Sequence, residues 1–149
     1  MSTATSFYDI YAKFAMKTTD YVLDAMYIAS TPNYYNYVKG FLLPSIAKFT
    51  QCNQDLTQRD DTTQTFSITL TDLEQEILAS LMLVEWCSKE VHSVMELRNH
   101  MTDTDFRLSP PYLVLRAKQD LLITTREAID KLITQYTFVG YDFTVDYEN

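Results

Sequence analysis

The feature that most constrains this chain is an apolar run at residues 77–87, ILASLMLVEWC, in which Glu85 is the single charged side chain. A bilayer crossing needs roughly 20 apolar residues, and this run is much shorter. A helix that is apolar on nearly every side belongs in the centre of a protein, surrounded by helices of its own chain or of neighbouring copies. The run therefore predicts a buried central helix and no membrane span.

The start of that helix has a strong local signal. Thr71 followed three residues later by Glu74 is the capping-box arrangement, in which the hydroxyl accepts from the Glu74 N–H and the carboxylate reaches back to the cap. We expect the helix to cover residues 71–100. Glu85 precedes Lys89 by four residues, the favourable order for an ion pair on a helix surface. A buried acid is the functional alternative for Glu85.

A second long helix is predicted over residues 111–137. Ser109 and Pro110 combine a cap with a proline at the first helical position. Apolar side chains then recur at intervals of three and four, at Val114, Ala117, Leu121, Ala128, Leu132 and Tyr136, with Leu122, Ile129 and Ile133 widening the stripe. The two long helices predict a mainly α fold, a helical bundle with a minor β-strand or hairpin.

The first half of the chain carries shorter predicted elements. Apolar spacing before residue 30 predicts two short helices or one broken helix. Residues 30–33 (STPN) predict a turn, and Pro44 fits the first turn of a further helix. Residues 52–65 are polar and aperiodic, which indicates a loop, whereas residues 66–70 alternate as a short strand does.

Composition and charge narrow the classes of function. The chain has 149 residues with 46% apolar content, which fits one domain, residues 1–149. Its start lacks the features of a signal peptide. Residues 71–149 hold seven basic against fourteen acidic side chains. Because tight nucleic-acid binding needs clustered Lys and Arg, we expect none; the acidic surface either keeps the protein soluble or lets DNA pass without sticking.

No catalytic, cofactor-binding or metal-binding motif stands out. The chain has two glycines, too few for a phosphate-binding loop, and it has no GxSxG, HExxH or CxxC. Cys52 and Cys87 are far apart in sequence and are expected to be free thiols in a reducing compartment. His92, Glu96 and His100 share one helix face, but the outer two are too distant to hold one ion. A solvated face is therefore preferred over a metal site.

Two features indicate binding. Seven of the eleven tyrosines fall within the first 37 residues, and Tyr8, Tyr11, Tyr34, Tyr35 and Tyr37 are candidates for a contact surface. The alternative is that these tyrosines rim a small core. Near the C-terminus, Tyr141, Phe143, Val145 and Tyr147 alternate with polar side chains, which predicts a strand in a C-terminal extension, residues 138–149. That strand pairs either within the chain or with a partner.

The order of segments over residues 8–138 resembles that of a known family. The segments IYAKFAMKTTDY, FLLPSIAKFTQCNQDLTQRDDTTQTFSITLTDLEQEILASLMLVEW and DTDFRLSPPYLVLRAKQDLL, followed by LITQYTF, carry the likeness. Together they resemble small virion structural proteins of tailed bacteriophages, of the neck or head-to-tail connector (adaptor) type. The resemblance implies a mainly helical protein that forms rings below the portal and clasps its neighbours with terminal segments. It also implies an acidic channel through which the genome passes.

The resulting expectation is a non-enzymatic ring component of the virion, assembled in the host cytoplasm. Its partners would be further copies of itself and portal, neck or tail proteins, with no specific DNA binding, no membrane and no small-molecule substrate. One alternative is a monomeric acidic intracellular protein that inhibits a DNA-binding factor by charge mimicry. Another is a metalloenzyme that uses His92, Glu96 and His100.

Overall fold

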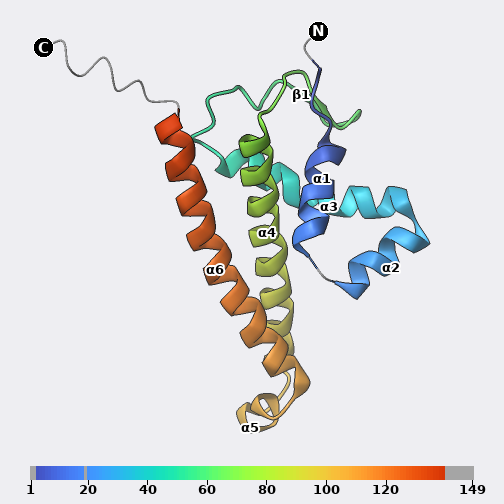
Figure 1. The fold of residues 1–149 in the computed structure, drawn as a ribbon. Coiled ribbons are helices and arrows are strands. Elements are labelled where there is room, and N and C mark those ends of the chain that lie inside the picture. Colours follow the sequence, from blue (N-terminus) through green and yellow to red (C-terminus); the bar gives the residue numbers. More distant parts are fainter. Residues whose placement is uncertain (1–2, 19, 140–149) are drawn as a thin grey trace, which may run out of the picture.

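The computed structural model describes residues 3–18 and 20–139 (Figure 1). These residues form six helices and one short β-hairpin. The elements are α1 (Phe7–Lys17), α2 (Tyr21–Ala29), α3 (Thr31–Lys48), β1 (Arg59–Asp60), β2 (Thr65–Phe66), α4 (Asp72–Arg98), α5 (Asp103–Arg107) and α6 (Pro110–Val139). The prediction of a mainly α fold around two long helices, with a minor hairpin, is confirmed.

Helix α4 is the centre of the fold. In Figure 1, α6 runs antiparallel along one side of α4, while α1 and α3 contact α4 from another side. The buried positions of the apolar run are Ile77, Leu78, Ala79, Ser80, Met82, Leu83, Val84, Trp86 and Cys87. Because successive residues are turned by about 100° around a helix, these buried side chains point in every direction. Other parts of the chain therefore surround this stretch of α4. The predicted central helix is confirmed, and each large apolar side chain that it buries contributes about 1.5–3 kcal/mol.

The predicted start of α4 is also confirmed. Thr71 Oγ1 accepts from Glu74 N at 3.2 Å, and Glu74 Oε2 accepts from Thr71 N at 2.8 Å, so both halves of the capping box are present. The helix ends at Arg98, two residues before the predicted end.

The seam between α4 and α6 follows a seven-residue repeat on α6. Its buried and half-buried positions are Leu115, Lys118, Leu122, Thr125, Ile129, Leu132 and Tyr136, alternately three and four residues apart as in a coiled coil. The predicted stripe is therefore partly wrong, because Val114, Ala117, Leu121 and Ala128 are exposed. Helix α6 carries two neighbouring apolar stripes, and contact with α4 selects one of them.

Helix α3 begins earlier than the sequence predicts. Residues 30–33 do not form a separate turn, because Ser30 is the cap of α3 and its hydroxyl accepts from Asn33 N at 3.5 Å. Pro44 does not start a helix but lies inside α3. A proline there removes one helical hydrogen bond. Helix α3 persists because Leu42 and Ile46, on either side of Pro44, are buried in the core.

The strand predicted over residues 66–70 is mostly wrong. Only Thr65–Phe66 pairs with Arg59–Asp60, and β1 lies inside the segment predicted to be a loop. Beyond Phe66 the chain runs beside the N-terminal segment: Leu70 N donates to Thr5 Oγ1 at 2.8 Å, and Thr5 N donates to Ile68 O at 3.1 Å. The apolar alternation reflects burial of Phe66 and Leu70 rather than a ladder of strand pairs.

Glu85 does not pair with Lys89. Its carboxylate forms an ion pair with Lys48 of α3, and it is half-buried. The Lys89 ammonium instead lies 4.6 Å from the centre of the Tyr37 ring and 5.9 Å from that of Phe41. The aromatic faces of α3 attract the cation, which leaves Glu85 to the lysine on the neighbouring helix.

Among the described residues, no helix combines the length and the apolarity that a bilayer crossing needs. Helix α6 continues through Phe138 to Val139, so the predicted C-terminal extension begins with helical residues. The strand predicted from Tyr141, Phe143, Val145 and Tyr147 lies outside the described residues.

Candidate functional site

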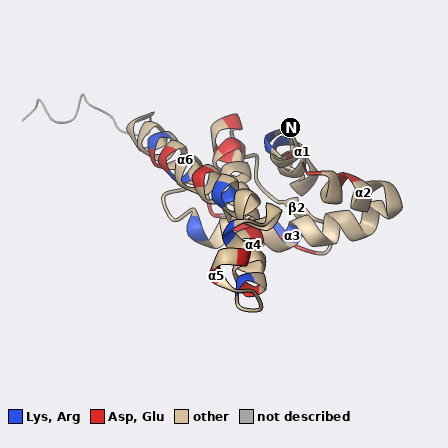
Figure 2. Ribbon diagram, turned by 90° about the horizontal axis from the view of Figure 1, so that it is seen from below, with Lys and Arg blue, Asp and Glu red and all other residues tan. Residues whose placement is uncertain are grey.

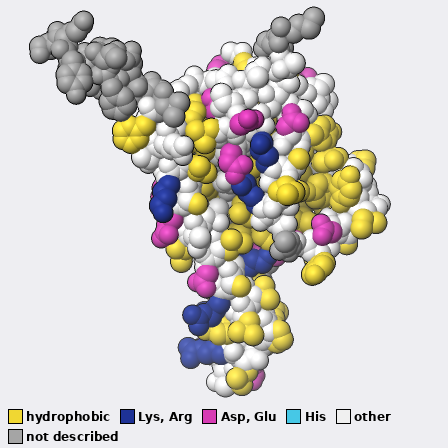
Figure 3. Space-filling view, in the orientation of Figure 1, with side chains coloured by type: hydrophobic (Ala, Val, Ile, Leu, Met, Phe, Trp, Pro, Cys, Tyr) yellow, Lys and Arg dark blue, Asp and Glu magenta, His cyan; other side chains and the backbone are white. Residues whose placement is uncertain are grey.

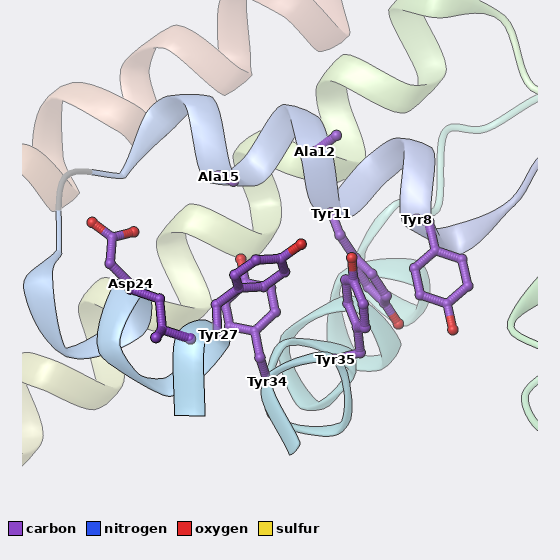
Figure 4. A pocket seen from close by; sticks show the side chains of 9 residues that line it. Tyr8, Tyr11, Ala12, Ala15, Asp24, Tyr27, Tyr34 and Tyr35 are labelled. Carbon is purple, nitrogen blue, oxygen red and sulfur yellow. The ribbon is translucent and has the colours of Figure 1, made fainter. Parts of the chain in front are cut away.

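Tyrosines from three helices line one groove of about 490 Å³ (Figure 4). Its lining consists of Tyr8, Tyr11, Ala12 and Ala15 from α1, Asp24, Tyr27 and Ile28 from α2, and Tyr34 and Tyr35 from α3. The small side chains of Ala12 and Ala15 leave space along the α1 wall. The groove thus brings together four of the five predicted N-terminal tyrosines.

Tyr35 occupies the middle of this arrangement. Its ring centre lies 4.6 Å from that of Tyr8 and 6.2 Å from that of Tyr27, with interplanar angles of 83° and 88°. The Tyr11 ring is nearly parallel to Tyr35, at 22° and 5.8 Å. Two rings therefore stand perpendicular to Tyr35 and a third lies parallel to it, so the lining presents both ring faces and ring edges.

The tyrosines divide into buried and exposed members. Tyr11 and Tyr34 are 2% and 7% exposed, whereas Tyr8 and Tyr27 are 42% and 47% exposed. Core packing accounts for the buried pair, and the exposed pair remains open to a ligand. The interpretation of the tyrosines as part of a small core fits Tyr11 and Tyr34, and the contact surface stays a prediction for Tyr8.

The tip of the β-hairpin fixes the α1 wall. Gln64 Oε1 accepts from Tyr11 Oη at 2.8 Å, and Gln64 Nε2 donates to Tyr8 Oη at 3.4 Å. The Gln64 carbonyl also accepts from Phe7 N at 2.9 Å. Gln64 has a φ of 55°, in the left-handed region that non-glycine residues rarely adopt. This backbone conformation is held by contacts that position the two tyrosines.

The electrostatics of the lining are one-sided. Asp24 is the single carboxylic acid in the lining, where the other ionisable groups are tyrosine hydroxyls. The lining contains no Lys, Arg or His. Within residues 3–18 and 20–139, no ion pair engages the Asp24 carboxylate. Burial, and then the neighbouring Tyr35 and Asp24, raise the pKa of the Tyr34 hydroxyl. The groove is therefore neutral to negative at its surface.

Five lining residues are absent from the predicted contact set, and the two polar ones among them are Asp24 and Tyr27. They lie three residues apart and so share one face of α2, a signal that the sequence did contain. Tyr37, which is in the predicted set, lies elsewhere: its ring packs on Phe41 at 5.1 Å and beneath the Lys89 ammonium. Tyr35 and Tyr37 are turned by about 200° from each other on α3, so they face different sides.

The three residues of the possible metal site do not converge on one point. His92 Nε2 and Glu96 Oε1 are 3.4 Å apart on an exposed part of α4, and His100 lies beyond the end of that helix. In the described part of the chain, no three His, Cys, Asp or Glu side chains are grouped closely enough to hold a metal ion.

A second polar cluster lies under the C-terminal end of α6. Glu74 is 3% exposed, and its carboxylate accepts from Tyr136 Oη at 2.9 Å and from Gln54 Nε2 at 2.6 Å. The Cys52 thiol is 3.9 Å from Tyr136 Oη, and burial raises the pKa of this thiol. A thiol with a raised pKa is a poor nucleophile, so we assign this cluster a structural role.

Comparison of the chain with protein family models, curated proteins and solved structures gave no match. The functional conclusion therefore depends on the surfaces and the groove of this chain.

Proposed function

We propose that this protein is a non-enzymatic structural component of a tailed-bacteriophage virion. In this proposal it forms a ring in the neck, or head-to-tail connector, by self-association and docks to portal or tail proteins around the DNA channel. The resemblance of the sequence suggests the setting. The observation that supports a binding role is the exposure of apolar side chains on two separate helices.

The first apolar surface covers α2 and the end of α1. Tyr21 is 91% exposed and Ile28 is 84% exposed, and Met16 and Val22 are also open to solvent. Figure 3 shows hydrophobic side chains gathered over this part of the molecule. Contiguous exposed apolar patches are uncommon on monomeric proteins and usually mark protein contacts.

The second apolar surface lies on the first half of α6. Val114 and Leu121 are exposed there, and Leu113 lies beside them, outside the seam with α4. This is the second apolar stripe of α6, the one that α4 does not cover. A helix of another molecule could bury this stripe, as α4 buries the first stripe of α6.

Two unlike apolar surfaces on one chain favour a head-to-tail contact between copies. Such a contact joins one surface to a different surface on the next copy, and it closes into a ring when the rotation between copies permits. A self-complementary dimer, in contrast, needs only one surface. This is the physical reason for proposing a ring.

The charge pattern favours a protein that DNA passes over a protein that mimics the charge of DNA phosphates. Residues 71–139 hold eleven acidic and seven basic side chains, so this part of the chain is only moderately acidic. Figure 2 shows acidic and basic residues interspersed along α6. A phosphate mimic needs an acidic face free of basic side chains, and the interspersed charges of α6 do not form such a face. The charge-mimicry alternative therefore has no specific support.

The mass of the protein in solution tests this proposal. Light scattering with negative-stain microscopy should find ring-shaped oligomers, alone or with a candidate portal protein. Val22→Glu places a charge in the α2 surface and should shift the population to monomer with unchanged helical circular dichroism. Thr134→Glu adds the same charge at an exposed position in the second half of α6, on a different face from Val114 and Leu121, and should leave assembly unchanged. A wild-type monomer at all concentrations, with or without portal protein, would contradict the proposal.

The proposed C-terminal clasp has its own test. Deleting residues 140–149 leaves α6 intact to Val139 and removes Tyr141, Phe143, Val145 and Tyr147. The truncated protein should keep its helical content and assemble more weakly. Unchanged assembly would rule out a role for this segment in contacts between copies.

A further inference from the structure

We propose that the tyrosine-lined groove binds the guanidinium group of an arginine side chain presented by a segment of a partner protein. This inference deepens the proposed function, since it names the side chain that a docking partner inserts. The groove is the site already described between α1, α2 and α3, and Figure 4 shows Asp24 at one end of a row of tyrosine rings.

The ring geometry suits a flat cation. A cation is attracted to an aromatic face when it lies within about 6 Å of the ring centre, and a guanidinium can also stack on that face. Tyr8 and Tyr27 flank Tyr35 at nearly right angles, and both are substantially exposed. Tyr27 is the exposed ring on the Asp24 side of the row, so a cation beside the Asp24 carboxylate can also contact an aromatic face.

The charge of the lining selects a cation over an anion. Asp24 stands one helical turn before Tyr27, and no Lys, Arg or His lines the groove. A carboxylate without an ion-pair partner can accept two parallel hydrogen bonds from a guanidinium. The tyrosine hydroxyls add further acceptors. An anion would find no positive charge here.

The same chemistry distinguishes arginine from other cations. A quaternary ammonium has no N–H donor and would leave the Asp24 carboxylate without a hydrogen bond. A lysine ammonium is compact and strongly hydrated, whereas the guanidinium is planar, more weakly hydrated and matched to a carboxylate. Arginine is the side chain that uses the aromatic faces and the acid together.

The chain already holds one of its own cations with this combination. The Lys118 ammonium lies 3.7 Å from the centre of the Trp86 ring and 4.0 Å from Asp20 Oδ2, half-buried between α4, α6 and the cap of α2. An aromatic face and a carboxylate therefore do stabilise a cation in this fold. The groove offers the same pair of groups, open to solvent.

Binding of N-acetyl-arginine amide, followed by NMR of ring-labelled tyrosines, tests the inference. The citrulline analogue is the matched neutral probe, because it keeps the shape and loses the charge. We expect saturable shifts of Tyr27 and of Tyr34, whose ring packs on Tyr27, with the arginine probe and much smaller shifts with citrulline. The lysine analogue and tetramethylammonium should bind more weakly than arginine.

Two variants and a control connect the binding to the groove. Asp24→Asn should weaken arginine binding severalfold, as loss of an ion pair at an exposed carboxylate predicts. Ala15→Leu should block the groove and abolish the shifts. Asp9→Asn, at an exposed site on α1 outside the lining, should bind arginine as the wild type does. Circular dichroism checks that each variant is folded.

Equal binding of arginine and citrulline, or an unchanged affinity in folded Asp24→Asn, would overturn the inference. So would the absence of arginine-specific shifts at the highest soluble probe concentration. These measurements use the Val22→Glu protein, which is expected to be monomeric. They therefore give an answer about the groove whether or not the wild type forms rings.

Discussion

The hydroxyl of Tyr136 donates a 2.9 Å hydrogen bond to the buried carboxylate of Glu74, and so ties the end of α6 to the first turn of α4. Tyr136 Oη also accepts from Asn53 N at 2.8 Å, and Glu74 Oε2 accepts from Gln54 Nε2 and Thr71 N. Four hydrogen-bond donors thus serve the Glu74 carboxylate and the Tyr136 hydroxyl, and within the described residues Glu74 forms no ion pair. The carboxylate that caps α4 therefore also joins α6 and the loop after α3.

Removing the Tyr136 hydroxyl should destabilise the protein. Tyr136→Phe keeps the ring against Phe49 but leaves Glu74 and Asn53 N without this partner. Because hydrogen bonds to charged groups contribute about 1.5–3 kcal/mol, the free energy of unfolding in urea should fall by about that amount. Tyr21→Phe removes an equally sized group from a side chain that is almost fully exposed, and it should have no measurable effect. Equal effects of the two variants would contradict the assigned role of Tyr136.

Stability should decline in alkaline solution because of buried tyrosines. Burial raises the pKa of Tyr11 and of Tyr136 above the ordinary value of 10. Above pH 10 the unfolded chain releases these protons while the folded protein retains them, so each tyrosine lowers the free energy of unfolding by about 1.4 kcal/mol per pH unit. Below pH 10 this loss is absent. Urea titrations between pH 8 and pH 11 should show a shallower decline for Tyr11→Phe and an unchanged decline for Tyr21→Phe.

A single methyl group on α3 should stabilise the fold. A Cβ added at Gly40 meets no atom within 4 Å, and Gly40 is exposed within the helix. Because glycine disfavours a helix interior by about 0.5–1 kcal/mol relative to alanine, Gly40→Ala should raise the free energy of unfolding by about that amount. Ala47→Gly makes the reverse change at an exposed position of the same helix, and it should lower stability similarly. Destabilisation by Gly40→Ala would show that α3 needs glycine for another reason.

Thiol labelling should distinguish the two cysteines. Cys87 is fully buried in α4, and burial raises its pKa to about 11. Burial raises the pKa of Cys52 too, but this thiol is only half-buried and so within reach of a reagent. Since the thiolate is the reactive form, a thiol reagent at pH 8 should label Cys52 in the folded protein and reach Cys87 only when the core opens. Labelling of Cys52→Ala should therefore follow global unfolding as urea is added, and labelling of Cys87→Ala should not. Rapid labelling of Cys87 in the folded state would mean that α4 is not enclosed as described.

The sequence predicted the features that depend on local chemistry. The capping box at Thr71 and Glu74 involves side chains and backbone groups three residues apart, so their identities determine it. The apolar run at residues 77–87 is enclosed because a helix with apolar side chains on nearly every face is stable only when other elements cover it. Proline at the start of α6 is likewise a local signal.

The predictions failed where a side chain or a helix face had more than one possible neighbour in the folded protein. Lys89 had both Glu85 and the aromatic rings of α3 within reach, and only packing showed that the rings hold it. Both apolar stripes of α6 satisfy the three-four spacing, and α4 covers one. Tyr37 lies outside the groove because it is turned by about 200° from Tyr35 on α3, and Tyr27 of α2 lines the groove instead.

By itself, the sequence determined that this chain is a helical protein with an enclosed central helix, since capping and apolar periodicity act over one or two helical turns. The tertiary structure decided which apolar stripe of α6 remains exposed, which lysine neutralises Glu85, and that Asp24 stands at the end of a row of tyrosines. Those outcomes depend on how helices approach one another, and the free energies that choose between alternative neighbours arise only when distant segments meet.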